Sequence, residues 1–430
     1  MKIVMFTNTY LPHVGGVARS VSTFAQDLQD LGHEVMVVCP HFSGTEDAPG
    51  QGPVPVVRVP AIQNFNGSDF SVRIPIPFSL SQQLDSFRPD LVHSHHPFLM
   101  GDTALRCSRQ RKLPLVFTHH TLYERYTHYV PLDSEPMKRF VIRLSTEYAN
   151  MCNRVIAPSR SVAELIKSRG VAKPIHEIPT GVDVDALTSG DREAMRRALN
   201  IGPETLVIGH VGRLAPEKNL AFLGQSVARA LEDIPEGVFV LTGDGPSLKT
   251  VQDEFARRGL TERLITTGKK TGQELIDMYQ AMDLFVFAST SETQGLVLAE
   301  AMAADNPVIA LEASGTREVV RDGSNGLLLS SQATVDDFAA AITRWASEPK
   351  KRQAWSTAAR ETAWNFSRQR CAKSLADVYA SVQSSFHPEA SPFEDLQPWV
   401  TVLTSLKTEW DLISQKTSAF FSAVTPPQDT

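Results

Sequence analysis

Ile3-Val4-Met5-Phe6 is a short apolar run with polar residues on both sides. Such a run is typical of a strand that is buried on both faces of a parallel sheet. An amphipathic stretch at 17–31 predicts a helix, and a second apolar run at 34–38 predicts the next strand. Further predicted strands follow at 91–93, 115–117 and 154–157. Alternating strands and helices predict an α/β fold with a doubly wound parallel sheet.

The same alternation starts again after a break. Residues 179–183 are rich in turn-forming types and residues 185–203 are polar. Predicted strands then follow at 206–209, 238–241, 264–266, 284–287 and 307–310. A single core stops growing near ~250–300 residues, so a chain of 430 residues is expected to form two domains.

We therefore predict two Rossmann-like domains with a cleft between them. Their expected bounds are 1–185 and 201–363, with a linker at 186–200, a closing helix at 364–385 and an amphipathic tail at 386–430. The tail carries apolar residues at roughly helical spacing, at Trp399, Leu403, Leu406, Trp410 and Ile413. Such a tail suits a membrane surface or a partner, and packing on its own domain is the alternative.

The overall composition argues against several classes of protein. A net charge of −6 does not suit a nucleic-acid binder. The four cysteines are far apart and form no C-x-x-C pair, which indicates a reducing compartment without a disulfide framework or zinc knuckle. The apolar run at the N-terminus is too short for a signal sequence, and no stretch of ~18 apolar residues follows. We expect a soluble or peripheral cytoplasmic protein.

Ligands of open α/β sheets bind beyond the carboxyl ends of the strands, so the residues after each strand are candidates. Gly15 and Gly16 open the first predicted helix, where a close backbone approach and helix N–H groups suit a phosphate or a sugar. The loop after the first strand of the second set reads Gly-Arg-Leu-Ala-Pro-Glu-Lys-Asn at 212–219. Its cations Arg213 and Lys218 suit a diphosphate. The alternative is two solvated surface cations.

Two carboxylates, Glu292 and Glu300, stand eight residues apart in the second half. Glu292 falls in a loop, and Glu300 falls about two turns into a helix expected to start near Gln294. Between them, Gly295 and Leu296 would present N–H groups at the helix N-terminus. This arrangement suits an extended ligand with hydroxyl groups at both ends and phosphates between. For Glu300 alone, the alternative is an exposed helix salt bridge.

Together these motifs resemble glycosyltransferase family 4, over residues 1 to about 385. The resemblance rests on several motifs, namely the Glu292/Glu300 pair, Gly15-Gly16, the loop at 212–219 and Gly243-Asp244-Gly245. It implies the GT-B fold of two Rossmann-like domains, with an acceptor-side domain first and a donor-binding domain second. It also implies an enzyme, a retaining hexosyltransferase that uses a nucleoside-diphosphate sugar and needs no separate cofactor.

The resemblance implies a role for each candidate on the donor side. Gly16 would contact the phosphate side of the donor. Arg213 and Lys218 would bind the diphosphate. Glu292 would bond the sugar hydroxyl groups, and Glu300 would bond the ribose.

His120, in Thr118-His119-His120-Thr121, matches the active-site histidine of the family near the transferred sugar. Glycosyl transfer builds positive charge on the sugar and negative charge on the leaving diphosphate. Fixed cations and N–H dipoles stabilise that charge. The family resemblance implies that the departing phosphate takes the acceptor's proton on the same face.

No metal is expected, although two motifs resemble metal sites. Asp183-Val184-Asp185 has D-x-D spacing but lies in the turn between the domains, which predicts activity that survives a chelator. His93, His95 and His96 cluster at a strand end, where the first two share one face and the third points away. A zinc site needs three or four converging ligands, so pocket-lining or structural histidines are expected instead.

A narrower resemblance concerns the acceptor. The segments 93–101 and 118–129, with Thr293-Gln294-Gly295, resemble a bacterial subgroup that includes the 1,2-diacylglycerol 3-glucosyltransferases. This implies UDP-glucose as donor, a lipid acceptor and a peripheral position on the inner membrane face. Basic residues suit an anionic membrane surface, at Arg106, Arg109, Arg111, Lys112, Lys138, Arg139 and Arg143. Acidic residues such as Glu135 interrupt them, which favours an ordinary solvated face.

Several other functions remain open at this point. One is the same chemistry directed at a soluble sugar or another small-molecule acceptor. An epimerase or a phosphorylase would keep the phosphate-binding groups, and a nucleotide-sugar-binding regulator would bind without turnover. A membrane scaffold acting through the tail is a further class. Turnover that depends on a sugar nucleotide and an acceptor distinguishes a transferase from the epimerase, the phosphorylase, the regulator and the scaffold.

Overall fold

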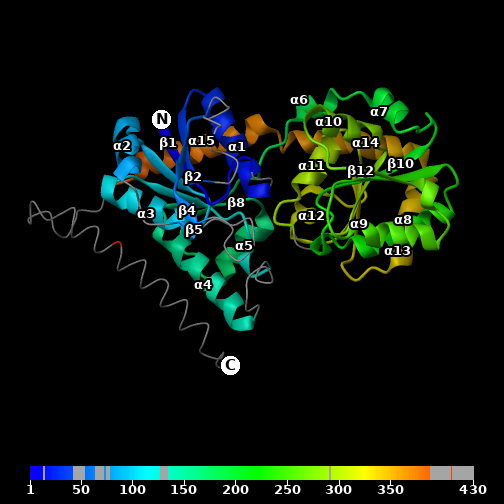
Figure 1. Cartoon of the computed structure of the whole chain (residues 1–430), viewed down its shortest axis with the longest axis horizontal. Coiled ribbons are helices and arrows are strands. Elements are labelled where there is room, and N and C mark those ends of the chain that lie inside the picture. The colour runs from blue at the N-terminus through cyan, green and yellow to red at the C-terminus, as the bar shows by residue number, and fades with distance from the viewer. Residues whose placement is uncertain are drawn as a thin grey trace, which may run out of the picture. The chain divides into compact units, whose positions relative to one another are not determined.

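The computed structural model describes residues 1–12, 15–41, 54–62, 72–73, 78–125, 134–289, 292–387 and 408. They form two compact units. One contains the residues up to Thr180 together with those from Cys371 on, and the other is Gly181–Arg370 (Figure 1). Most of the predicted tail at 386–430 lies outside the described residues. Among these residues, no helix combines the length and the apolar character needed to span a bilayer.

The first unit contains a seven-stranded parallel sheet in the order β3-β2-β1-β6-β7-β8-β9. Its strands are β1 (Lys2–Phe6), β2 (Glu34–Pro40), β3 (Val56–Val59), β6 (Leu91–Ser94), β7 (Leu115–Thr118), β8 (Arg154–Ala157) and β9 (Ile175–Glu177). The chain runs outward from β1 to β3 and then returns to the other side of β1. The topological switch, where such folds bind ligands, therefore lies between β1 and β6. A separate antiparallel pair consists of β4 (Ala61–Ile62) and β5 (Val72–Arg73).

Helices cover both faces of this sheet. They are α1 (Gly16–Asp30), α2 (Phe78–Phe87), α3 (Met100–Arg111), α4 (Glu135–Met151), α5 (Arg160–Ser168) and α15 (Arg368–Ser385), with a short 3₁₀ turn, η2 (Tyr123–Arg125). Successive residues of β1 alternate between two buried clusters, since Val4 and Phe6 pack on one face and Ile3 and Met5 on the other. The apolar run quoted at the outset is thus a strand buried on both faces, as predicted.

From Cys371 on, helix α15 belongs to the first unit although it follows the whole second unit in the chain. Its residues Leu375 and Tyr379 pack in the same cluster as Ile3 and Met5. In Figure 1, α15 appears in orange among the blue elements of the first unit. The predicted closing helix at 364–385 is in fact the end of α14 at Trp364 followed by α15 from Arg368.

The second unit contains a six-stranded parallel sheet in the order β12-β11-β10-β13-β14-β15. Its strands are β10 (Leu206–Val211), β11 (Gly237–Thr242), β12 (Leu264–Gly268), β13 (Leu284–Phe287), β14 (Val308–Leu311) and β15 (Gly326–Leu329). The topological switch of this sheet lies between β10 and β13, which are neighbours.

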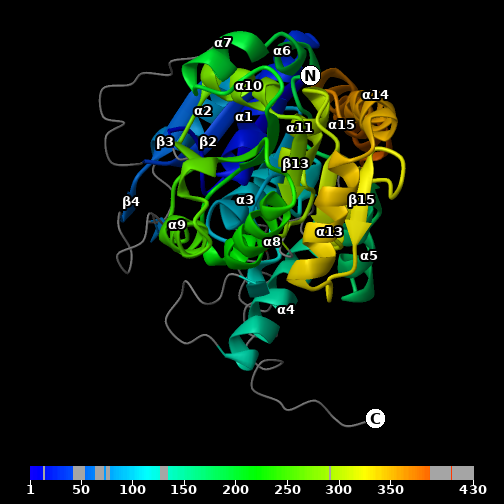
Figure 2. The ribbon, with the colours of Figure 1, turned by 90° about the vertical axis from the view of Figure 1, so that its right-hand side faces the viewer.

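The helices of the second unit also lie on both faces of its sheet. They are α6 (Val184–Thr188), α7 (Arg192–Ala198), α8 (Leu220–Glu232), α9 (Leu248–Arg257), α10 (Gly272–Ala281), α11 (Leu296–Ala303), α12 (Ser314–Val319), α13 (Val335–Ala346) and α14 (Pro349–Trp364), with 3₁₀ turns η4 (Pro216–Lys218) and η5 (Thr261–Arg263). Figure 2 shows α8 beside α13, and the two pack together in one core cluster.

The predicted linker at 186–200 is part of the second unit. Its polar residues form α7, whose Arg196 is only 5% exposed. The Arg196 guanidinium bonds to the Asp283 carboxylate over 2.7 Å and to several backbone carbonyl groups. A polar composition indicated a linker, whereas the Arg196 guanidinium is buried and compensated by these partners. The boundary between the units falls at Thr180 and Gly181.

Candidate functional site

The loop after β10 is held in shape by the loop after β11. The Leu214 N–H donates to the carbonyl oxygen of Asp244 over 2.8 Å. Gly243 has a φ of +143°, and a Cβ at this residue would lie 1.8 Å from the carbonyl oxygen of Gly212. Only glycine permits this backbone approach. The Gly-Asp-Gly motif therefore has a structural task in positioning the cationic loop.

Each cation of the loop after β10 is paired with a carboxylate. Arg213 forms an ion pair with Glu217, and Lys218 forms one with Glu292. Ser289 also donates to the Glu292 carboxylate over 3.1 Å. The Arg213 side chain is 56% exposed, whereas those of Lys218 and Glu292 are 21% and 18% exposed. The structure thus brings together Lys218 and Glu292 from two adjacent strand ends and pairs Arg213 separately.

Glycines shape the start of α11. Gly295 has a φ of +73° and is the residue before the helix, so α11 begins at Leu296 instead of near Gln294. The Gly315 N–H donates to the carbonyl oxygen of Glu292 over 3.1 Å. A Cβ on Gly315 would lie 2.8 Å from the Cβ of Glu292. The positive end of the α11 dipole therefore lies directly beside the Glu292 loop.

Glu300 is buried on α11. Its side chain is 3% exposed, and its Oε2 accepts a hydrogen bond of 2.8 Å from the Tyr279 hydroxyl on α10. The exposed salt bridge considered from the sequence is therefore wrong. Tyr279 was not identified from the sequence, because nothing in the local pattern marks a tyrosine whose partner lies on another helix.

In the first unit, His120 follows β7 and pairs with His95, which follows β6. The Nδ1 of His95 and the Nε2 of His120 lie 2.9 Å apart, and the two rings are stacked at 5.2 Å between centroids. The ring of His93 lies 4.0 Å from that of His95. The two nitrogens of His93 bond to the hydroxyl groups of Tyr379 and Thr118. His95 was considered from the sequence, but its pairing with His120 was not.

Burial keeps the histidine cluster neutral, which consists of His93, His95, His96, His119 and His120. It lowers the pKa of His93 and that of His96 to about 3, and it lowers the pKa of His119 to about 4. The pKa values of His95 and His120 also lie well below the usual range, because burial disfavours the charged form and neighbouring histidines add like charge. Near neutral pH the cluster therefore offers hydrogen bonds and no positive charge.

Gly15 and Gly16 lie at the start of α1 in the first unit. Gly15 is extended, with a φ of −174°. A Cβ on Gly16 would have no neighbour within 4 Å. Packing within the described residues therefore does not require glycine at position 16, so a strict requirement for glycine there would have to come from a ligand.

The motifs that resemble metal sites have structural partners. The Asp183 carboxylate accepts from the Ala186 N–H over 3.0 Å at the start of α6 and pairs with Arg368 over 3.1 Å. Throughout the described ranges, no three His, Cys, Asp or Glu side chains are grouped so that they could hold a metal ion.

His210 was not identified from the sequence, although it lies beneath the cationic loop. Its ring is fully buried on β10 and stacks with Phe285 and Phe287 of β13. Its Nδ1 donates to the carbonyl oxygen of Val286 over 3.0 Å. Burial lowers the pKa of His210 to about 4, with Lys218 lowering it further and Glu292 opposing this. Near neutral pH His210 is therefore a neutral ring that lies within electrostatic reach of Lys218 and Glu292.

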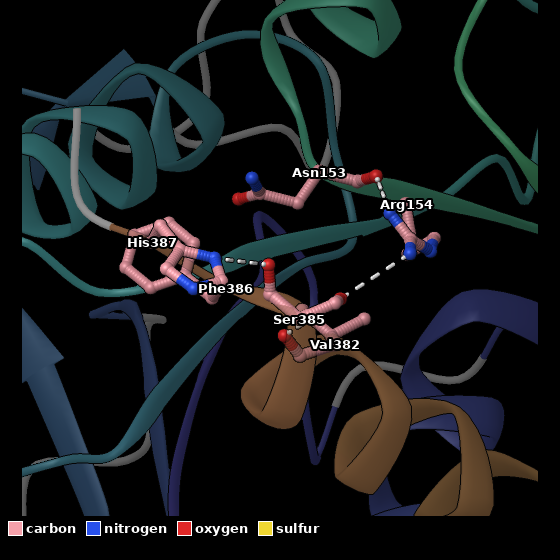
Figure 3. A pocket seen from close by; sticks show the side chains of 6 residues that line it. All are labelled: Asn153, Arg154, Val382, Ser385, Phe386 and His387. Atoms are coloured by element: carbon pink, nitrogen blue, oxygen red, sulfur yellow. Dashed lines mark hydrogen bonds between the residues drawn. The ribbon is translucent and has the colours of Figure 1, made fainter.

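A small cavity of about 180 Å³ lies near the amino end of β8 in the first unit (Figure 3). Arg154, the first residue of β8, points there toward Ser385 at the end of α15, with 3.5 Å between the guanidinium and the hydroxyl. The cavity thus lies at the amino ends of the strands, whereas His95 and His120 follow the carboxyl ends of β6 and β7. The cavity is therefore separate from the candidate site.

Comparison with known families covers both units. The profile described as Glycosyltransferase Family 4 matches residues 14–186, and that described as Glycosyl transferases group 1 matches residues 191–362. The chain belongs to glycosyltransferase family 4. The resemblance stated from the sequence motifs is thereby confirmed, and the chain is a glycosyltransferase.

Curated relatives of this glycosyltransferase are named for different sugars. An alpha-monoglucosyldiacylglycerol synthase of Streptococcus pneumoniae is 30% identical, over 72% of this chain and 71% of that protein. A GDP-mannose-dependent alpha-mannosyltransferase of Corynebacterium glutamicum is 31% identical, over 76% of each chain. A second alpha-monoglucosyldiacylglycerol synthase, from Acholeplasma laidlawii, is 28% identical over 77% of this chain and 85% of that protein.

Solved structures share the fold of this glycosyltransferase. Anabaena HepE in complex with UDP matches with a TM-score of 0.73 at 22% identity, over 89% of this chain and all of that one. Sucrose-phosphate synthase of Thermosynechococcus elongatus matches with a TM-score of 0.72 at 21% identity, over 89% and 99% of the two chains. The predicted GT-B architecture of two Rossmann-like parallel-sheet domains is confirmed.

Proposed function

We propose that this family 4 glycosyltransferase transfers glucose from UDP-glucose to the free hydroxyl of diacylglycerol, with retention of anomeric configuration. One observation carries the donor side of this proposal. Lys218 and Glu292 form a mostly buried pair at the carboxyl ends of β10 and β13, the two strands that flank the topological switch of the second sheet. Open α/β sheets bind nucleotides at this position.

The charges around this pair suit a nucleoside-diphosphate sugar. Lys218 and the N-terminus of α11 supply positive charge, and Arg213 adds a more exposed cation in the same loop as Lys218. Glu292 and Glu300 supply carboxylates that accept hydrogen bonds from hydroxyl groups. In our assignment, Arg213 and Lys218 leave their carboxylate partners and bind the diphosphate of the donor. Glu292 then accepts from the sugar hydroxyl groups, and Glu300 accepts from the ribose.

The transfer step needs no group beyond these and the substrates. The bond between the anomeric carbon and the diphosphate oxygen breaks, and its electron pair leaves with the diphosphate. The acceptor oxygen bonds to the same face of the sugar, and its proton passes to the departing phosphate. Lys218, Arg213 and the α11 N-terminus stabilise the growing negative charge. His120 lies near the transferred sugar in this assignment.

The choice of glucose and of a lipid acceptor is supported by the relatives. Two of them are named alpha-monoglucosyldiacylglycerol synthases, and their α-linked product agrees with retention from an α-linked donor. We place the reaction at the inner membrane face, where diacylglycerol is available. The mannosyltransferase relative makes GDP-mannose the main competing donor.

The test measures nucleoside diphosphate release from UDP-glucose and GDP-mannose, with and without diacylglycerol in anionic micelles. We expect UDP release that rises strongly with diacylglycerol, an α-glucosyl lipid by NMR, and no loss of rate with a chelator. A β-linked product would exclude the same-face step. Turnover of GDP-mannose alone, or turnover only with a soluble acceptor, would replace the donor or the acceptor. Binding without any turnover would favour a regulator.

A further inference from the structure

We propose that His95 is a positioning residue that donates its Nδ1 proton to Nε2 of His120 and thereby leaves the His120 ring proton on Nδ1. His120 then presents a hydrogen-bond donor to an oxygen of the donor sugar. The second statement rests on the proposed function, because it places His120 at the sugar. The first is a property of the free protein.

The geometry requires one of the two rings to donate. Nδ1 of His95 and Nε2 of His120 are 2.9 Å apart, a hydrogen-bond distance, with the rings stacked at an angle of 22°. Both rings are neutral, so each carries one proton on one of its two nitrogens. Two arrangements are therefore available, and they differ in which ring holds the shared proton.

The second nitrogen of His95 decides between them. Its Nε2 is buried and has no hydrogen-bond partner among the residues that the structure describes. If His95 accepted from His120, its own proton would lie on this Nε2 as a buried N–H without an acceptor. Such a donor is rare in native proteins, because a buried N–H without an acceptor destabilises the folded state. If His95 donates, Nε2 keeps only an unused lone pair, which is the milder defect.

The neighbouring histidines do not offer an alternative partner. Both nitrogens of His93 are engaged, with Tyr379 at 2.6 Å and Thr118 at 2.7 Å. The Nδ1 of His96 accepts from the Asn8 N–H over 3.1 Å. These bonds hold the cluster in place around His95, which is fully buried. The direction of the His95–His120 bond is therefore determined within the pair.

This direction limits what His120 does in the reaction. Its Nε2 lone pair is occupied by His95, and its Nδ1 carries a proton. The ring therefore donates to an oxygen lone pair and does not accept the acceptor's proton. This agrees with the transfer step in which the departing phosphate takes that proton.

The test of the bond direction uses NMR of the full chain labelled with ¹⁵N-histidine, without ligand. Signals are assigned by their loss in His95→Asn and His120→Asn. We expect a ring proton bonded directly to His95 Nδ1, with a coupling across the hydrogen bond to His120 Nε2. A proton bonded to His120 Nε2, or no coupling between the two rings, would overturn the proposal.

Two substitutions connect the bond to turnover. His95→Asn keeps an N–H donor near the position of Nδ1, whereas His95→Ala removes it. We expect His95→Asn to stay within about threefold of the original kcat and His95→Ala to lose about tenfold, which is the effect of one hydrogen bond. Of these two variants, only His95→Asn should retain the His120 Nδ1 proton signal. Equal losses of kcat in two folded variants would contradict the positioning role.

A matched control separates positioning from packing. His93→Ala removes another buried ring of the same cluster that does not bond to His120. It should lower the melting temperature and leave the His120 Nδ1 proton signal in place. If the original chain turns over no sugar nucleotide, the proposed function fails, while the NMR result on the bond direction still stands.

Discussion

The Tyr279 hydroxyl donates a hydrogen bond of 2.8 Å to Oε2 of Glu300, and both side chains are buried. A buried carboxylate is costly without partners. The bond from Tyr279 therefore helps to orient the Glu300 carboxylate. In the proposed donor site, this is the carboxylate that meets the ribose.

We expect Glu300→Gln to weaken UDP binding by about 10–100-fold, because a hydrogen bond to a charged group contributes about 1.5–3 kcal/mol. Tyr279→Phe should weaken UDP binding less, since it removes one hydrogen bond to the carboxylate and keeps the carboxylate itself. Titration calorimetry with UDP measures both. Tyr123→Phe is the control, because it removes a buried hydroxyl that has no partner among the described residues. Unchanged UDP binding in Glu300→Gln would remove Glu300 from the site.

Lys218→Met is expected to lower kcat/KM by about 10²–10³-fold, because it removes a cation that stabilises the leaving diphosphate. Combined with Glu292→Gln in a double-mutant cycle, the losses should be strongly non-additive, since the two side chains form one ion pair. Lys249→Met breaks the exposed pair with Asp253 in the same unit and serves as the control. Additive losses would mean that the two groups act independently.

Gly16→Ala separates a ligand requirement from a structural one. A Cβ at this position has no neighbour within 4 Å, so we expect unchanged stability or a gain of up to about 1 kcal/mol. Donor kcat/KM should nevertheless fall, because the methyl group would occupy the place of the donor phosphate. Gly32→Ala should lower the stability and leave donor kcat/KM unchanged, because a φ of +85° is strained for alanine. Full activity in Gly16→Ala would show that no ligand approaches there.

His210 should make the second unit sensitive to acid. Its pKa is lowered from 6.5 to about 4 by burial, with Lys218 and Glu292 as the charged groups that face it. The unfolded chain therefore binds a proton between pH 6.5 and 4 that the folded chain does not. Stability is then fully present above about pH 6.5 and decreases as the pH falls toward 4. The limiting slope is about 1.4 kcal/mol per pH unit for one proton.

His210→Asn tests this slope, since its amide keeps a donor toward the Val286 carbonyl and does not titrate. Urea unfolding at several pH values should give a lower stability at neutral pH but a shallower decrease between pH 6.5 and 4. An unchanged slope would mean that other groups dominate, among which His93, His96 and His119 also have pKa values lowered by burial.

The two-sheet architecture was predictable because burial leaves a local pattern. Runs such as 3–6 and 284–287 became strands buried on both faces. The loop after β10 contained Arg213 and Lys218, and the loop after β13 contained Glu292, where topology places ligands at the carboxyl ends of parallel strands. Each of these inferences uses residues close together in the chain.

The remaining features depend on contacts between distant residues. Polar composition suggested a linker at 186–200, whereas burial of Arg196 against Asp283 makes it part of the second unit. Tyr379 reaches His93 from 286 positions away. Neither pairing leaves a periodic signal, because the partners belong to different elements.

The sequence by itself determined the fold class, the family motifs and the candidate residues, because these depend on local burial patterns and short spacings. Only the tertiary structure decided the partners of those residues. Glu300 proved to be buried against Tyr279, Lys218 to be paired with Glu292, and His120 to be bonded to His95. The physical reason is that hydrogen-bond direction and charge pairing depend on distance in space, which folding alone establishes.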